Sequence, residues 1–141
     1  MYMMTKYFSD RELSCRANGE LVIPRSGSER ECFLRTLELA DKMREEFGGP
    51  LTCLSGYRTA VHNLRVGGAL RSMHRILALD LRPADWDPID RPESELVRLH
   101  EIALKNADGV GRYSTFIHVD LRQYVHRRPA QWTQLTEWSP T

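Results

Sequence analysis

The stretch Phe116-Ile117-His118-Val119-Asp120-Leu121-Arg122 alternates between apolar and polar side chains. Residues two apart in a β-strand point to the same face. The pattern therefore predicts a strand that carries His118, Asp120 and Arg122 on one face and apolar residues on the other. Because burying a polar group without a partner is costly, a histidine beside a carboxylate in such a strand indicates a site.

A second segment, Ser72-Met73-His74-Arg75-Ile76-Leu77-Ala78-Leu79-Asp80, has the same character. The alternation from Leu77 to Leu81 predicts a strand with Asp80 on the face opposite the leucines. His74 lies in the loop before this strand. Two histidines and one carboxylate are the protein ligands of many catalytic zinc sites, so His74, Asp80 and His118 are candidate ligands. The simpler interpretation is two structural histidines, each paired with a nearby carboxylate.

The flanking sequence predicts a long helix on the amino-terminal side. The pattern Ser28-Glu29-Arg30-Glu31 is a capping box, and apolar residues then recur with the helical period. Gly48-Gly49-Pro50 is a typical stop signal, with glycine as the cap and proline beyond it. A buried strand is expected next, at Leu51 to Ser55.

The remaining elements complete an α+β pattern. A second helix is expected to begin near Asp90 and to end near Gly109, followed by paired strands at Val110 to Tyr113 and Phe116 to Arg122. We therefore predict an α+β fold with a small, mostly antiparallel sheet and helices packed on one side. Residues 1–122 form the predicted domain, and residues 123–141 form a tail that packs on it.

The composition excludes some classes of function. The chain has 141 residues, 20 basic and 19 acidic, with a formal net charge of +1. This balance argues against nucleic-acid binding, which depends on basic contacts with phosphates. No stretch approaches the ~20 apolar residues of a membrane span, and Met1 to Phe8 lacks the pattern of a signal peptide. Cys15, Cys32 and Cys53 have no regular spacing, so free, mostly buried thiols are expected. The length fits one domain, and a monomer is expected.

Ordered motifs connect the chain to a known family. They are Tyr7-Phe8-Ser9, Glu12-Leu13, Cys15, Ser55-Gly56-Tyr57-Arg58-Thr59, Asn63, Val66-Gly67-Gly68-Ala69, Ser72-x-His74, Ala78-x-Asp80, Gly111-Arg112-Tyr113 and Phe116 to Arg122. From Tyr7 to Arg122 the chain resembles the M15 zinc peptidases, in particular D-Ala-D-Ala carboxypeptidase-like and endolysin-type enzymes of bacteria and bacteriophages. The resemblance implies a small α+β fold like that of the hedgehog and D-Ala-D-Ala peptidase proteins.

The resemblance also implies roles for individual residues. Zn²⁺ would be held by His74, Asp80 and His118. Arg58 matches an arginine that faces the substrate in the family, where it is suited to bind a carboxylate. Two more residues are assigned to substrate binding by the resemblance: Ser72 and Tyr113. Asp120 is the nearest carboxylate on the correct face and is the candidate general base. The other interpretation of Asp120 is an ion pair with Arg122 or Arg82.

The expected function is zinc-dependent cleavage of peptidoglycan stem peptides, as a carboxypeptidase or as an endopeptidase. Synthesis in the cytoplasm, action on the bacterial cell wall and an origin in a bacteriophage are expected. Two departures from the family pattern keep open a non-catalytic cell-wall-binding or phage structural module. His74 and Asp80 are six positions apart, one fewer than in the family. Phe116 and Thr115 stand where several members carry an acid or a histidine.

Overall fold

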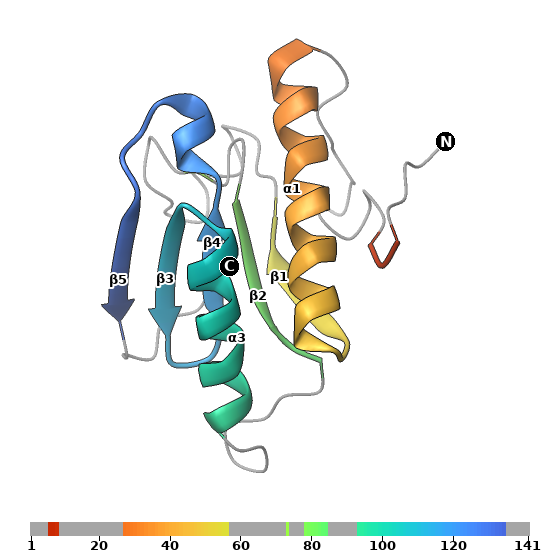
Figure 1. The fold of residues 1–141 in the computed structure, drawn as a ribbon, viewed down its shortest axis with the longest axis vertical. Coiled ribbons are helices and arrows are strands. Elements are labelled where there is room, and N and C mark those ends of the chain that lie inside the picture. Colours follow the sequence, from red (N-terminus) through yellow and green to blue (C-terminus); the bar gives the residue numbers. More distant parts are fainter. Residues whose placement is uncertain (1–5, 9–26, 57–72, 74–77, 85–92, 135–141) are drawn as a thin grey trace, which may run out of the picture.

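The computed structural model describes residues 6–8, 27–56, 73, 78–84 and 93–134. Within these ranges it contains two α-helices, a 3-10 helix and a five-stranded sheet (Figure 1). In chain order the elements are α1 (Gly27–Phe47), β1 (Leu51–Ser55), β2 (Ala78–Pro83), α3 (Glu93–Asn106), β3 (Gly109–Tyr113), β4 (Ile117–Asp120), η3 (Arg122–Val125) and β5 (Ala130–Gln134). The predicted α+β class is confirmed.

The strands are arranged in the order β1-β2-β4-β3-β5. Every neighbouring pair is antiparallel except β3 with β5, which is parallel. The sheet is therefore mostly antiparallel, as predicted. Its order makes β2 and β4 direct neighbours, although the helix α3 and the strand β3 separate them along the chain. Strand β2 contains the end of the second segment singled out in the sequence, and β4 lies within the first, so these parts of the two segments lie side by side in the sheet.

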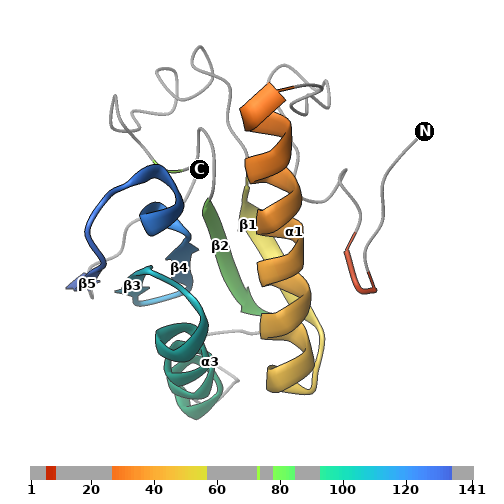
Figure 2. The same ribbon diagram turned by 45° about the horizontal axis from the view of Figure 1, so that its top comes forward.

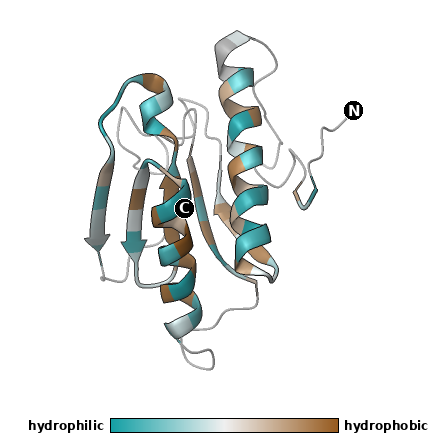
Figure 3. Ribbon diagram, in the orientation of Figure 1, coloured by the Kyte–Doolittle hydropathy of each residue, from teal (hydrophilic) through white to brown (hydrophobic). Residues whose placement is uncertain are grey.

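Both helices cover the same face of the sheet (Figures 1 and 2). Apolar and polar residues alternate along them, as expected for helices with one buried side (Figure 3). The buried residues between helices and sheet are Phe33, Leu37, Ala40, Met43, Phe47, Leu79, Leu81, Leu96, Leu99, Ile102, Ala103, Val110, Ile117 and Val119. Burying one large apolar side chain stabilises the fold by about 1.5–3 kcal/mol, so this face of the sheet supplies the main core.

The predicted end of α1 agrees with the structure, whereas the helix begins at Gly27, one residue before the predicted cap Ser28. The helix ends at Phe47, and Gly48 follows with a φ of 74°. The backbone N–H of Gly48 donates to the carbonyl of Arg44, at 3.1 Å. A positive φ of this size strains most side chains but not glycine. Gly48 therefore serves as the cap that the stop signal predicted.

The opposite face of the sheet carries polar residues. Asp80, His118 and Asp120 are all buried, with exposed fractions of 2%, 8% and 0%. Each is next in sequence to a core residue of the same strand. Because successive side chains of a strand point to opposite faces, these three point away from the core. The predicted division into an apolar and a polar face is confirmed for the described residues of β2 and β4, and the polar faces meet. The strand expected at Phe116 to Arg122 is shorter in the structure, since β4 ends at Asp120 and Arg122 begins η3.

Candidate metal centre

Asp80 and His118 form the centre of the polar face. They are directly opposed in the antiparallel register of β2 and β4. Their side chains lie on the same side of the sheet, with Oδ1 of Asp80 3.1 Å from Nδ1 of His118. Backbone pairing between two central strands therefore sets the distance between a carboxylate and an imidazole.

The other nitrogen of His118 faces a second carboxylate. Nε2 of His118 lies 2.8 Å from Oδ2 of Asp120, two residues along the same strand. Asp120 in turn accepts hydrogen bonds from Arg122: Nε donates to Oδ1 at 2.9 Å and Nη2 to Oδ2 at 2.7 Å. The backbone N–H of Arg122 also donates to Oδ1, at 3.1 Å. The ion pair with Arg122 that the sequence left as the other interpretation of Asp120 is therefore present.

These contacts shift both ionisation equilibria. Burial lowers the pKa of His118, but hydrogen bonds to Asp120 and Asp80 outweigh it and raise the pKa to about 9. Burial raises the pKa of Asp120, but hydrogen bonds from Arg122 and His118 outweigh it and lower the pKa to about 2. Without a metal, the imidazole is therefore protonated near neutral pH and donates to both carboxylates.

Two glycines of β3 make room for this arrangement. Gly109 is paired with Asp120 and Gly111 with His118 in the register of β3 and β4. A Cβ at Gly109 would overlap the carboxylate of Asp120 and the guanidinium of Arg122. A glycine inside a strand commonly marks such a close approach. Glycines at positions 109 and 111 of a strand could have indicated a crowded site next to β4, but the prediction of the site from the sequence did not rest on them.

Comparison with protein-family models supplies the identity. The model described as Peptidase M15 matches residues 6–120, most of the chain. The chain belongs to the M15 peptidase family. No curated protein matches the chain closely enough to count as a relative. The M15 match covers the strands that hold Asp80, His118 and Asp120, and it ends at Asp120.

The M15 resemblance also assigned roles to Arg58, Ser72, His74 and Tyr113. Of these four, the structure describes only Tyr113. Tyr113 lies at the end of β3, where its ring stacks on Phe116 with the centroids 4.4 Å apart. Arg58, Ser72 and His74 lie outside the described residues. Within the described ranges, no group of three His, Cys, Asp or Glu side chains is arranged to hold a metal ion. The structure thus brings together two of the three predicted zinc ligands and the predicted base.

The spacing of the two candidate ligands that the structure describes, Asp80 and His118, suits a zinc ion. Two ligand atoms bound to one tetrahedral zinc lie roughly 3.3 Å apart, given bonds of about 2.0–2.1 Å. The 3.1 Å between Asp80 Oδ1 and His118 Nδ1 is close to this spacing. A ligating histidine usually donates its other N–H to a carboxylate, which fixes its orientation. Asp120 stands in that position, so the donor set fits a zinc ion between Asp80 and His118.

One residue of the site was missed as a functional residue in the sequence. Trp132 of β5 lies against the ring of His118, with the ring centroids 5.2 Å apart. Its segment falls beyond the part of the chain that matches the M15 model. The parallel pairing of β5 with β3 brings Trp132 to the site. No local pattern in the sequence predicts this pairing.

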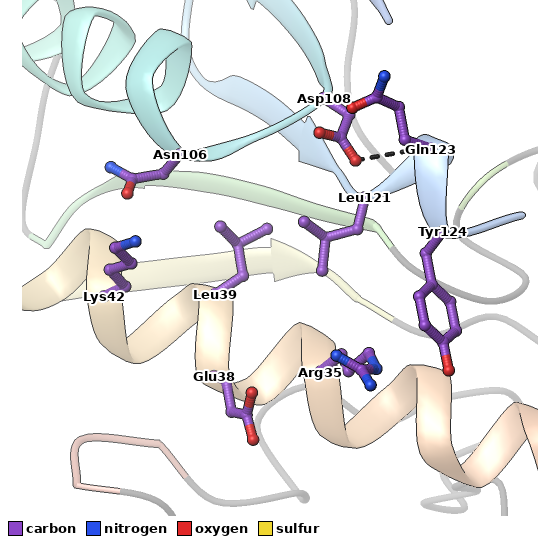
Figure 4. A pocket seen from close by; sticks show the side chains of 9 residues that line it. All are labelled: Arg35, Glu38, Leu39, Lys42, Asn106, Asp108, Leu121, Gln123 and Tyr124. Carbon is purple, nitrogen blue, oxygen red and sulfur yellow. Dashed lines mark hydrogen bonds between the residues drawn. The ribbon is translucent and has the colours of Figure 1, made fainter. Parts of the chain in front are cut away.

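A separate hollow of about 490 Å³ lies on the helix-covered side of the sheet (Figure 4). Its lining combines both signs of charge over an apolar floor: Arg35, Glu38, Leu39, Lys42, Asn106, Asp108, Leu121, Gln123 and Tyr124. Asp108 accepts the backbone N–H of Gln123 there, at 3.2 Å. None of the predicted site residues lines this hollow. No helix in the described ranges is long and apolar enough to cross a membrane.

Proposed function

We propose that this M15 peptidase is a zinc-dependent hydrolase of peptidoglycan stem peptides. The observation that carries the proposal is the buried Asp80–His118 pair, which has the spacing of two zinc ligands and a carboxylate behind the imidazole. His74, which precedes β2 in the sequence, is proposed as the third ligand. Bound Zn²⁺ would supply Lewis-acid polarisation of the scissile carbonyl and acidification of a water molecule.

The residues around the proposed metal have separate roles. Asp80 and His118 hold it. Asp120 keeps the imidazole of His118 in the orientation and tautomer that leave Nδ1 free for the metal, and Arg122 holds Asp120 in place. Arg58 is proposed to bind a carboxylate of the substrate through its guanidinium fork. Ser72 and Tyr113 are proposed to line the substrate cleft.

Asp120 as the general base stays a prediction from the sequence, and the contacts support the orienting role instead. A general base works best when its pKa lies near the operating pH and when it can reach the proton that it removes. The pKa of Asp120 is lowered to about 2. Its side chain is fully buried and bonded to both Arg122 and His118.

The test begins with zinc itself. Purified protein is dialysed against a chelator and titrated with zinc, and peptide release from defined muropeptides is then measured by mass spectrometry. We expect uptake near one equivalent, chelator-sensitive release and loss of both in His118→Ala. The exposed His126, changed to Asn, is the matched control. A parent protein that takes up no zinc, or His118→Ala that binds zinc like the parent, would overturn the proposal.

The same experiment distinguishes the two proposed bond specificities. Loss of a terminal D-alanine indicates a carboxypeptidase. New amino termini within the stem peptide indicate an endopeptidase of the kind found in phage lysis enzymes. Both use the same proposed metal ligands, and they differ in whether the substrate carboxylate at Arg58 is terminal.

A non-catalytic wall-binding module is the second candidate function. One observation favours it: Phe116, at a position where several M15 members carry an acid, is fully buried and stacked on Tyr113. It cannot accept a proton from water. Binding to purified peptidoglycan in the presence of chelator, without release of amines, would support the module. Chelator-sensitive release of amines would exclude it.

A further inference from the structure

An indole ring covers one side of the candidate zinc ligand. Gly111 of β3 is paired with His118 on one side and with Trp132 on the other. The three residues therefore form one row across β4, β3 and β5, with the side chains of His118 and Trp132 on the same face. Because Gly111 has no side chain, the indole reaches across it to the imidazole. The two planes are tilted by 46° at a centroid distance of 5.2 Å.

Trp132 is held at several points. Its Nε1–H donates to the hydroxyl of Tyr113, at 2.9 Å. The guanidinium of Arg122 lies 5.1 Å from its ring centroid, a distance at which a cation is attracted to an aromatic face. A Cβ at Gly111 would overlap the indole ring. The ring is therefore fixed against His118 and Arg122 at the same time.

We propose that Trp132 is a positioning residue of the metal site, which holds the imidazole of His118 and the Asp120–Arg122 pair in place. The inference rests on the proposed zinc function and assigns a role to a strand beyond the family match. The indole blocks rotation of the His118 ring toward β5. It also shields the guanidinium of Arg122 from water, and exclusion of water strengthens an ion pair.

The test compares variants of β5 and β3 by zinc affinity. Trp132→Ala removes the indole, and Trp132→Phe keeps an aromatic face but removes the N–H. Gln131→Ala is the matched control, because Gln131 is exposed and points to the other face of the same strand. Zinc dissociation constants come from competition with a chromophoric chelator, below the melting temperature of each metal-free variant. The values of kcat and KM for a muropeptide are measured on the zinc-loaded proteins.

We expect Trp132→Ala to weaken zinc binding about 10–100-fold, the usual range for residues that support a metal ligand. Trp132→Phe should lie closer to the parent, and Gln131→Ala should match it. If Trp132 only stabilises the fold, the melting temperature of the metal-free protein falls while zinc affinity and kcat stay at the parent values. That result would overturn the inference and leave the proposed function intact.

A second variant covers the case in which Trp132→Ala does not fold. Gly111→Ala keeps the indole but displaces it, so it should weaken zinc binding in the same direction. Unchanged zinc affinity in Gly111→Ala would overturn the inference. A parent protein that binds no zinc would overturn the proposed function, and this inference with it.

Discussion

Asp80 and His118 stand opposite each other on β2 and β4, with Oδ1 of one 3.1 Å from Nδ1 of the other. A slip of one residue in this register would turn the carboxylate toward the helices. Leu79 and Leu81 flank Asp80 in the core, so such a slip would also expose two leucines. The packing of the hydrophobic core therefore keeps the two candidate ligands opposed.

Zinc affinity is expected to rise with pH. In the metal-free protein the pKa of His118 is raised to about 9, so zinc must displace a proton from Nδ1 throughout the neutral range. The apparent affinity should increase about tenfold for each pH unit between pH 7 and 9, because one proton is released. Chelator competition at several pH values measures the slope. An affinity that does not change over this range would show that Nδ1 is not a ligand.

The stability of the metal-free protein should be greatest in mildly acidic solution. The folded pKa of His118, about 9, lies above its ordinary value of 6.5, so its contribution is fully present below pH 6.5 and is lost toward pH 9. The pKa of Asp120, about 2, lies below its ordinary 3.8, so its contribution is present above about pH 4 and is lost toward pH 2. Melting temperatures in chelator should therefore be highest between these limits. Gln131→Ala, an exposed substitution that removes no titrating group, should leave the profile unchanged. A profile that keeps rising above pH 7 would contradict the assignment.

Asp120→Asn should weaken both the fold and the metal site. Removing one partner of a buried ion pair costs about 3–5 kcal/mol, and Arg122 would lose its anion. Loss of the carboxylate behind His118 should reduce zinc affinity about 10–100-fold. Glu38→Gln, an exposed carboxylate of α1 at the hollow, is the control. If Asp120→Asn instead binds zinc normally and loses only turnover, the prediction of Asp120 as the base gains support.

Gly109→Ala tests the space beside Asp120. The added Cβ overlaps Asp120 and Arg122, and overpacking of this kind costs about 1–3 kcal/mol. Gly49→Ala is the matched control, since its Cβ would make ordinary contact with the ring of Phe47, at 3.5 Å. Denaturant unfolding measures both variants. Equal stability in the two would mean that β3 can move away from the ion pair.

The local features of the fold were predictable from the sequence. The alternation from Phe116 to Arg122 placed His118 and Asp120 on one face, and the 2.8 Å contact between their side chains confirms this. The stop signal after Phe47 located the end of α1. These predictions succeed because period and capping are decided by neighbours in the chain.

The assembly of the site was not predictable in the same way. The sequence grouped Asp80 with His118 as candidate zinc ligands, but neither strand specifies that β2 pairs with β4 in the register that opposes them. That pairing depends on β1, β3 and two helices packing together. The parallel pairing of β5 with β3 is still harder to predict from the sequence. It requires the chain to leave β4, pass through η3 and return beside β3. From the sequence, Trp132 was therefore expected only to belong to a tail, residues 123–141, that packs on the domain.

The position of β5 has a consequence for the order in which the molecule is completed. On a ribosome, α1, α3 and four strands are available before Trp132 is made. The hydrophobic core can therefore fold first. The site is complete only when β5 pairs with β3 and brings Trp132 against His118. Since β5 lies at the edge of the sheet and is largely exposed, it can also detach without unfolding the core. Amide hydrogens of β5 should then exchange sooner than those of β2 and β4. Bound zinc should slow that exchange, because release of the strand would loosen His118, the proposed zinc ligand.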